Sequence, residues 1–141
     1  VMPACYVTGF AQGGEAILNC TVNDVVSQGD VCDRLRQTEG LETLVLRCQP
    51  SPSLVEGNRD QEMKALQAFI EAPWMLLQAA LGIPSCAQLR VVLELPQPTT
   101  DLTKSIESFW SCWLASQNFD AADTQCKVEL RLLTEVPAGE S

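Results

Sequence analysis

The chain has 141 residues, of which 46% are hydrophobic and 19% charged, a composition that predicts one folded domain with a buried core. Its 18 acidic residues outnumber 9 basic ones, and the net charge of -9 argues against binding of nucleic acid or of anionic lipid. The chain has no histidine, which removes the commonest general base and the usual catalytic triads. We therefore expect a protein that is not an enzyme and has no catalytic, metal or cofactor site.

The first third of the chain predicts three short strands. Residues 4–10 and 16–22 are rich in β-forming side chains and flank a Gly-Gly pair, so they predict a hairpin. Residues 23–32 include the sequence Ser-Gln-Gly-Asp and are expected to form a loop. Residues 41–48 predict a third strand, and because apolar side chains fall on both of its faces, we expect it in the centre of the sheet.

The rest of the chain alternates helical and strand patterns. Pro73 interrupts a helical pattern over residues 63–81, so we expect either one kinked helix or two abutting helices. We expect the neighbouring Trp74 and Met75 to pack in the core. The predicted elements are a helix capped by Asn58 or Asp60, a strand over residues 88–95, a helix over residues 102–114 capped by Thr100 or Asp101, and a strand over residues 126–134.

These elements predict a single domain over residues 1–141 with the order β-β-β-α-β-α-β. The fold class is α+β, with a small mixed or antiparallel sheet, two amphipathic helices on one face and disulfide staples. The alternation of residues 88–95 places Glu94 on the solvent side of the sheet. A sheet covered on one face leaves its other face or an edge open to a partner.

Seven cysteines are many for this length, and no pair has the Cys-x-x-Cys spacing of zinc ribbons or thioredoxin-like proteins. Their wide spacing is typical of a disulfide framework in a secreted or lumenal protein, whereas a cytosolic protein would bury them as thiols. Because seven is odd, one cysteine stays free or bonds a partner chain. We hypothesise that the four N-terminal cysteines pair among themselves, Cys112 pairs with Cys126, and Cys86 is left over. The N-terminal four are Cys5, Cys20, Cys32 and Cys48.

A glycosylation sequon, Asn19-Cys20-Thr21, lies on the second predicted strand. A glycan requires a solvent-facing asparagine, so we expect Asn19 on an exposed face or edge. The chain opens at Val1, which fits a mature secreted chain, and no apolar run is long enough to predict a membrane span. We expect another protein as the partner, and the net negative charge would favour a basic one.

Five short motifs occur in this order along the chain: Cys5-Tyr6-Val7-Thr8, Asn19-Cys20-Thr21, Val26-Ser27, Cys32-Asp33 and Leu44-Val45-Leu46-Arg47-Cys48. Together they resemble the cysteine and sequon pattern of glycoprotein L of gammaherpesviruses. They cover the first third of the chain, and the helix over residues 63–81 extends the match. The resemblance implies a non-enzymatic subunit of the virion envelope. Such a subunit assembles with the larger glycoprotein H, supports its folding and transport, and contributes to receptor binding and membrane fusion.

Two other classes of protein stay open. One is a secreted cytokine-like or receptor-binding factor of cellular origin, which folds and is secreted by itself. The other is a cytosolic scaffold or assembly subunit that keeps its thiols free. A larger glycoprotein or a cell-surface receptor is the partner expected for a secreted chain, and no class requires direct insertion into a membrane.

Overall fold

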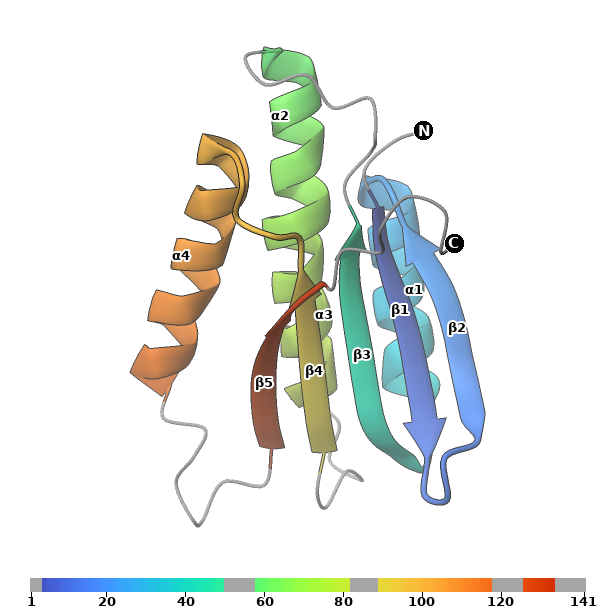
Figure 1. The fold of residues 1–141 in the computed structure, drawn as a ribbon. Helices are drawn as coiled ribbons and strands as arrows, with labels where there is room; N and C mark the ends of the chain where they lie inside the picture. The colour runs from blue at the N-terminus through green and yellow to red at the C-terminus, as the bar shows by residue number, and fades with distance from the viewer. Residues whose placement is uncertain (1–3, 50–57, 82–88, 118–125, 134–141) are drawn as a thin grey trace, which may run out of the picture.

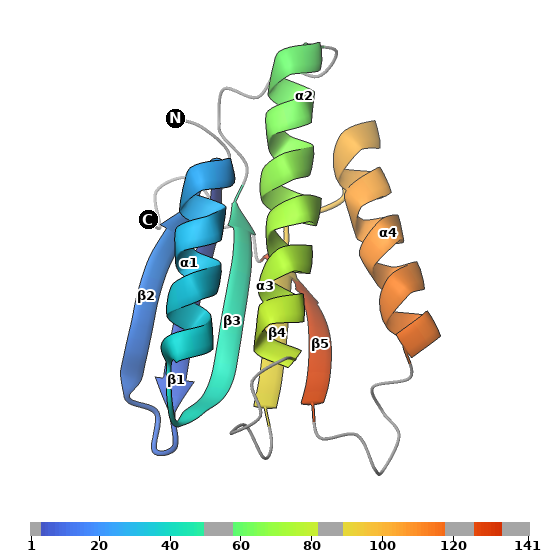
Figure 2. The same ribbon diagram turned by 180° about the vertical axis from the view of Figure 1, so that it is seen from behind.

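A five-stranded mixed sheet with helices on one face forms the body of this α+β protein. The computed structural model describes residues 4–49, 58–81, 89–117 and 126–133. The helices all lie on the same side of the sheet, and none in the described part of the chain covers the other side (Figures 1 and 2). The elements are β1 Ala4–Ala11, β2 Ala16–Val22, α1 Val25–Gln37, β3 Leu41–Gln49, α2 Arg59–Leu66, the π-helical η1 Gln67–Glu71, α3 Ala72–Leu81, β4 Leu89–Leu95, α4 Asp101–Gln117 and β5 Cys126–Leu132.

The strand order β2-β1-β3-β4-β5 joins an antiparallel and a parallel half. β1 pairs antiparallel with both β2 and β3, whereas β3–β4 and β4–β5 are parallel. Gly13 and Gly14 in the β1–β2 turn have φ of 99° and 89°, a conformation that glycine adopts without steric cost. The predicted hairpin is therefore confirmed, and β3 is the central strand as expected.

One predicted element was wrong, because residues 25–32, the greater part of the predicted loop, belong to helix α1. The Asp24 carboxylate accepts the Ser27 backbone N–H at 2.7 Å, and the Ser27 hydroxyl accepts the Asp24 N–H at 3.1 Å, which forms a capping box. Val31, Cys32 and Leu35 then bury one face of α1. Gly29 suggested a loop, but a helix tolerates one glycine at a cost of about 1 kcal/mol. The predicted order with two helices is thus corrected to β-β-α-β-α-β-α-β.

The connection from β3 to β4 is one continuous helix made of α2, η1 and α3. Asn58 caps it by accepting the Gln61 N–H at 3.2 Å, which confirms one of the two predicted caps. Pro73 does not break it; the irregularity is the π-helical turn just before Pro73. Proline has no N–H to donate to the Phe69 carbonyl four residues earlier. The buried indole Nε1 of Trp110 on α4 donates to that carbonyl at 2.8 Å and joins the two helices.

The core lies between the sheet and the helices. Leu46 of β3 and Leu93 of β4 are fully buried, as are Phe69 and Trp110 above them. Side chains of alternate strand residues point to opposite faces, so the covered face collects the apolar set. Trp74 packs against this core as predicted. Met75 is 39% exposed, so its predicted core position was wrong. No helix in the described part of the chain is long and apolar enough to cross a membrane.

Candidate functional site: the uncovered face of the sheet

The face of the sheet opposite the helices carries a regular array of side chains on β3, β4 and β5. Each strand contributes three residues that lie in register with those of its neighbour, and we call the nine together the grid. Their apolar neighbours along the strands face the helices instead. The rows of the grid are Thr43, Arg90 and Lys127; Val45, Val92 and Glu129; and Arg47, Glu94 and Arg131.

The charge of the grid is opposite to that of the whole chain. The grid holds four of the nine basic residues of the sequence and two of its eighteen acidic residues. An excess of positive charge therefore lies on one face of a protein whose net charge is -9. Local charge of this kind decides which surface of a partner can approach closely, because opposite charges in contact favour a complex and like charges oppose it.

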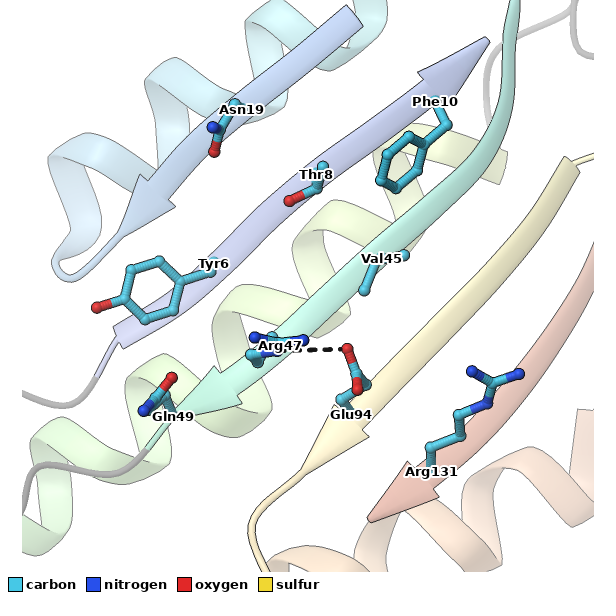
Figure 3. Close-up of a pocket in the computed structure, with 9 residues that line it drawn as sticks. All are labelled: Tyr6, Thr8, Phe10, Asn19, Val45, Arg47, Gln49, Glu94 and Arg131. Atoms are coloured by element: carbon cyan, nitrogen blue, oxygen red, sulfur yellow. Dashed lines mark hydrogen bonds and ion pairs between the residues drawn. The ribbon is translucent and has the colours of Figure 1, made fainter. Parts of the chain in front are cut away.

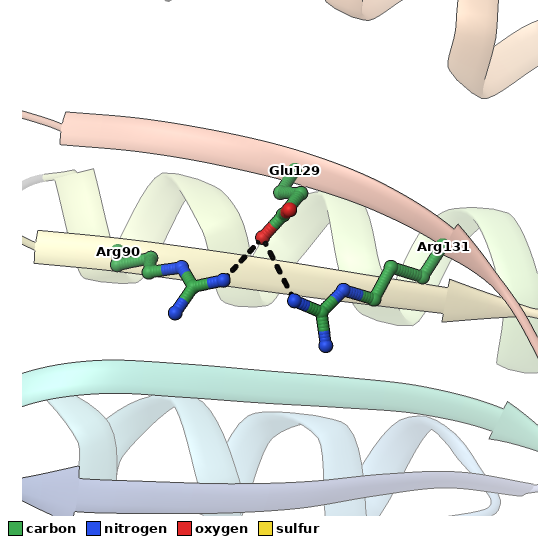
Figure 4. Close-up of polar contacts among 3 residues, drawn as sticks. All are labelled: Arg90, Glu129 and Arg131. Carbon is green, nitrogen blue, oxygen red and sulfur yellow. Dashed lines mark hydrogen bonds and ion pairs between the residues drawn. The ribbon is translucent and has the colours of Figure 1, made fainter.

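Ion pairs connect five of the six charged residues of the grid. Arg47 Nε lies 3.4 Å from Glu94 Oε1. Glu129 Oε2 accepts Arg90 Nη2 at 2.6 Å and lies 3.4 Å from Arg131 Nη2 (Figure 4). The hydrogen bond from Arg90 lowers the pKa of the Glu129 carboxyl below its usual value. The arginine side chains are each more than half exposed, so these pairs are screened by water and contribute little to stability.

A hollow of about 560 Å³ opens on the same face, beside and over the grid. Nine residues drawn from all five strands line it (Figure 3). Tyr6 and Phe10 lie toward its two ends along β1, and Arg47 and Glu94 point toward each other between β3 and β4 (Figure 3). Tyr6 is 40% exposed although it is a large aromatic side chain. Aromatic and arginine side chains together are the composition typical of the centre of a protein interface.

The sequon residue Asn19 lies at the rim of this hollow. It is exposed on β2, opposite Thr8 of β1, at an edge of the sheet. The expectation that Asn19 faces solvent is therefore confirmed, while glycosylation itself stays a prediction. A glycan attached there would stand beside the hollow.

The cysteines whose side chains the structure describes lie on the elements of the covered side and not on this face. Cys5, Cys20 and Cys48 are buried on the strands beneath the helices, Cys32 is buried on α1, and Cys112 is exposed on α4. All five are unbonded in the structure. Cys86 lies outside the described residues, as does the side chain of Cys126. The disulfide framework therefore stays a prediction, with four of its members gathered in one part of the core.

Sequence reasoning placed only one residue of the grid, Glu94, on the solvent side, and this orientation is correct. The alternation of polar with apolar residues in each strand was visible, but the partner of each strand was not. Glu94 meets Arg47 only because β3 and β4, 47 positions apart in the sequence at this pair, are neighbours. Among the described residues no group of three or more His, Cys, Asp or Glu side chains could hold a metal ion.

Comparisons of the chain with protein-family models, with curated proteins and with solved structures find no match. The function must therefore be inferred from the grid, the hollow and the rest of the geometry.

Proposed function

We propose that this chain is a non-enzymatic, secreted protein-binding subunit and that its docking surface is the uncovered face of the sheet. The observation that supports this is the one-sided packing of the sheet, with a hollow and a charged grid on the free side. A solvent-facing sheet needs only polar side chains, but this one also carries Tyr6, Phe10 and Val45 around the hollow. Such a mixture is characteristic of an interface.

The chemistry of the grid favours a partner that presents acidic side chains. Four basic residues on this face oppose only two acidic ones, and Arg47 and Arg131 line the hollow directly. Arginine binds carboxylates through two parallel hydrogen bonds, which fixes the orientation of the partner as well as attracting it. The net charge alone would favour a basic partner, but contact at this face follows the local charge.

Site-specific photo-cross-linking in secreting cells tests this proposal. A photoreactive phenylalanine analogue replaces Tyr6 in the hollow, and in a matched control chain it replaces Met63, which is 61% exposed on α2. We expect the Tyr6 position to yield one discrete cross-linked protein and the Met63 position to yield none. Adding Arg47→Glu to the Tyr6 chain should abolish the cross-link. Equal cross-linking from both positions, or none from Tyr6, would contradict the proposal.

The cross-linked protein also separates the two secreted hypotheses. A larger glycoprotein that co-purifies and needs this chain for its transport would support the subunit role implied by the resemblance to glycoprotein L. A host receptor captured at the cell surface by separately secreted protein would support a cytokine-like factor.

A second candidate, a cytosolic scaffold with free thiols, is favoured by one specific observation. The five cysteines whose side chains are described are all unbonded. Mass spectrometry of the native protein under non-reducing conditions separates the two candidates. Seven free thiols would support the cytosolic scaffold, whereas disulfides in the native protein would rule it out and agree with secretion.

A further inference from the structure

Two cysteines face each other across the boundary between β1 and β3. Cys5 and Cys48 are directly opposed partners in this antiparallel pair, and they approach to 4.3 Å without a bond. Directly opposed residues in antiparallel strands have Cα atoms about 4.5–5.5 Å apart. The Cα–Cα separation of opposed strand residues therefore lies within the range of about 4.4–6.8 Å that is found between the Cα atoms of disulfide-bonded cysteines. Both side chains point into the covered face, where each is completely buried.

The other buried cysteines are less well placed to bond Cys5. On its other side Cys5 is opposite Val22 of β2, and Cys20 is opposite Val7, so Cys5 and Cys20 are diagonal neighbours. Diagonal positions on paired strands are about 7–8 Å apart between Cα atoms, which is beyond the usual disulfide range. Cys32 lies on α1, in the layer above the strands. Among the buried cysteines on the described strands, register therefore favours Cys48 over Cys20 as the partner of Cys5.

We propose that Cys5 and Cys48 form a cross-strand disulfide that fastens the N-terminal strand β1 to the central strand β3. The bond closes a loop that contains the β1–β2 hairpin and α1, so it restricts the unfolded chain over almost a third of its length. This proposal goes beyond the protein-binding role and does not depend on which partner binds, but it rests on the secreted location proposed above, because the cytosol would keep both thiols reduced.

The burial of the pair indicates when the bond forms. Burial raises the pKa of the Cys48 thiol, and the contact with Cys5 raises it further. The thiolate is the reactive species, so the thiol of the folded chain is protonated and also hidden from reagents. The bond therefore forms while the chain folds, before the helices close over β1 and β3, and it resists reduction afterwards.

The oxidant is a small-molecule disulfide of the glutathione class. With Cys5 reacting first, its thiolate attacks one glutathione sulfur, forms a mixed disulfide and releases one glutathione thiolate. The Cys48 thiolate then attacks the Cys5 sulfur, forms the protein disulfide and releases the second glutathione thiolate. Each cysteine loses one proton to solvent, and two electrons pass from the protein sulfurs to glutathione.

Peptide mapping of the unmodified chain tests the pairing directly. The reduced, unfolded protein is refolded in a buffer of reduced and oxidised glutathione, its remaining thiols are alkylated, and it is cleaved after Lys, Arg and Glu. In the sequence this places Cys5 in the peptide 1–15 and Cys48 in the peptide 48–56. We expect these two peptides to be joined, and to separate on reduction. Alkylated Cys5 and Cys48, or Cys5 joined to the peptide that holds Cys20 and Cys32, would overturn the proposal.

Thermal unfolding of substituted chains gives an independent measurement. Cys5→Ser, Cys48→Ser and the double variant should each lower the Tm by about 10 °C and by similar amounts, because each loses the same bond. Ala16→Ser, which introduces a serine at an exposed position of β2 without removing a cysteine, is the control and should leave the Tm nearly unchanged. A double variant whose loss equals the sum of the two single losses would show two independent thiols and overturn the pairing. If the substituted chains do not fold, the peptide map of the unmodified chain decides alone.

Discussion

The two faces of the sheet are made by neighbouring residues of the same strands, yet they have opposite properties. Leu46 and Leu93 are completely buried beneath the helices, whereas the adjacent Arg47 and Glu94 form a partly exposed ion pair on the other face. The period of two along a strand separates an apolar core from a charged surface without any change of element. If a strand slipped by one residue, its apolar side chains would face solvent and its charged side chains would face the helices. The burial of the apolar side chains on the covered face therefore determines where each charged side chain lies on the free face.

The largest expected difference between the faces is in free energy of unfolding. Leu46→Ala removes a fully buried side chain from the covered face and should cost about 3 kcal/mol. Val45→Ala, the neighbouring residue on the free face, should cost less than about 1 kcal/mol because its side chain is only partly buried. Denaturant-induced unfolding measures both values. Equal costs would mean that the free face is buried as deeply as the covered one.

A buried side-chain hydrogen bond joins α4 to the neighbouring helix on the covered face. Trp110→Phe removes the indole N–H that the Phe69 carbonyl accepts and should cost about 2 kcal/mol, since Pro73 supplies no replacement donor. Phe109→Leu, at a 38% exposed position on the same helix, is the matched control and should cost less than about 1 kcal/mol. The prediction fails if chemical denaturation ranks the two variants in the opposite order.

A pair of glycine substitutions should change stability in opposite directions. A Cβ at Gly9 would lie 2.7 Å from Leu41 Cδ1 and 3.1 Å from Leu18 Cβ, so Gly9→Ala should cost about 1–2 kcal/mol. A Cβ at Gly29 in α1 meets no atom within 4 Å, and Gly29→Ala should stabilise the protein by about 0.5–1 kcal/mol. Thermal unfolding measures the change in stability of each of the two variants. A loss of stability at Gly29 would contradict the helix that the structure shows there.

The smallest effect concerns titration on the free face. Arg90 lowers the pKa of Glu129 from its usual value of 4.5, so the ionised pair stabilises the fold above that pH and loses its effect as the pH falls through the lowered value. Arg90→Gln should move the pKa of Glu129 back toward 4.5. Lys127→Gln, in the same row of the grid as Arg90, should leave it unchanged. NMR titration of the Glu129 carboxyl distinguishes these outcomes.

Local patterns in the sequence predicted the strands and the helix caps well. The bounds of β2 and the caps at Asn58 and Thr100 were correct, because each depends on residues within a few positions. The helix α1 was missed because Gly29 outweighed the spacing of Val31 and Leu35, which fits a buried helical stripe.

The grid and the cysteine pair were harder to predict, for a different physical reason. Arg47 with Glu94 and Cys5 with Cys48 are formed by strands that lie far apart in the sequence. Alternation shows which side of a strand a residue occupies, but not which strand lies beside it. The strand order determines which of these residues, distant in the sequence, lie side by side on the sheet.

The missing N–H of Pro73 affects the position at which α4 packs against the neighbouring helix. Apolar helices can slide along one another with little change in buried area, so hydrophobic packing alone defines their relative position weakly. In a regular helix the Phe69 carbonyl would accept the N–H of residue 73, which proline lacks, and the indole N–H of Trp110 donates to this carbonyl. One carbonyl without its usual helical donor and one indole donor thus help to fix how α4 lies against the neighbouring helix, and proline acts here as a source of specificity between helices.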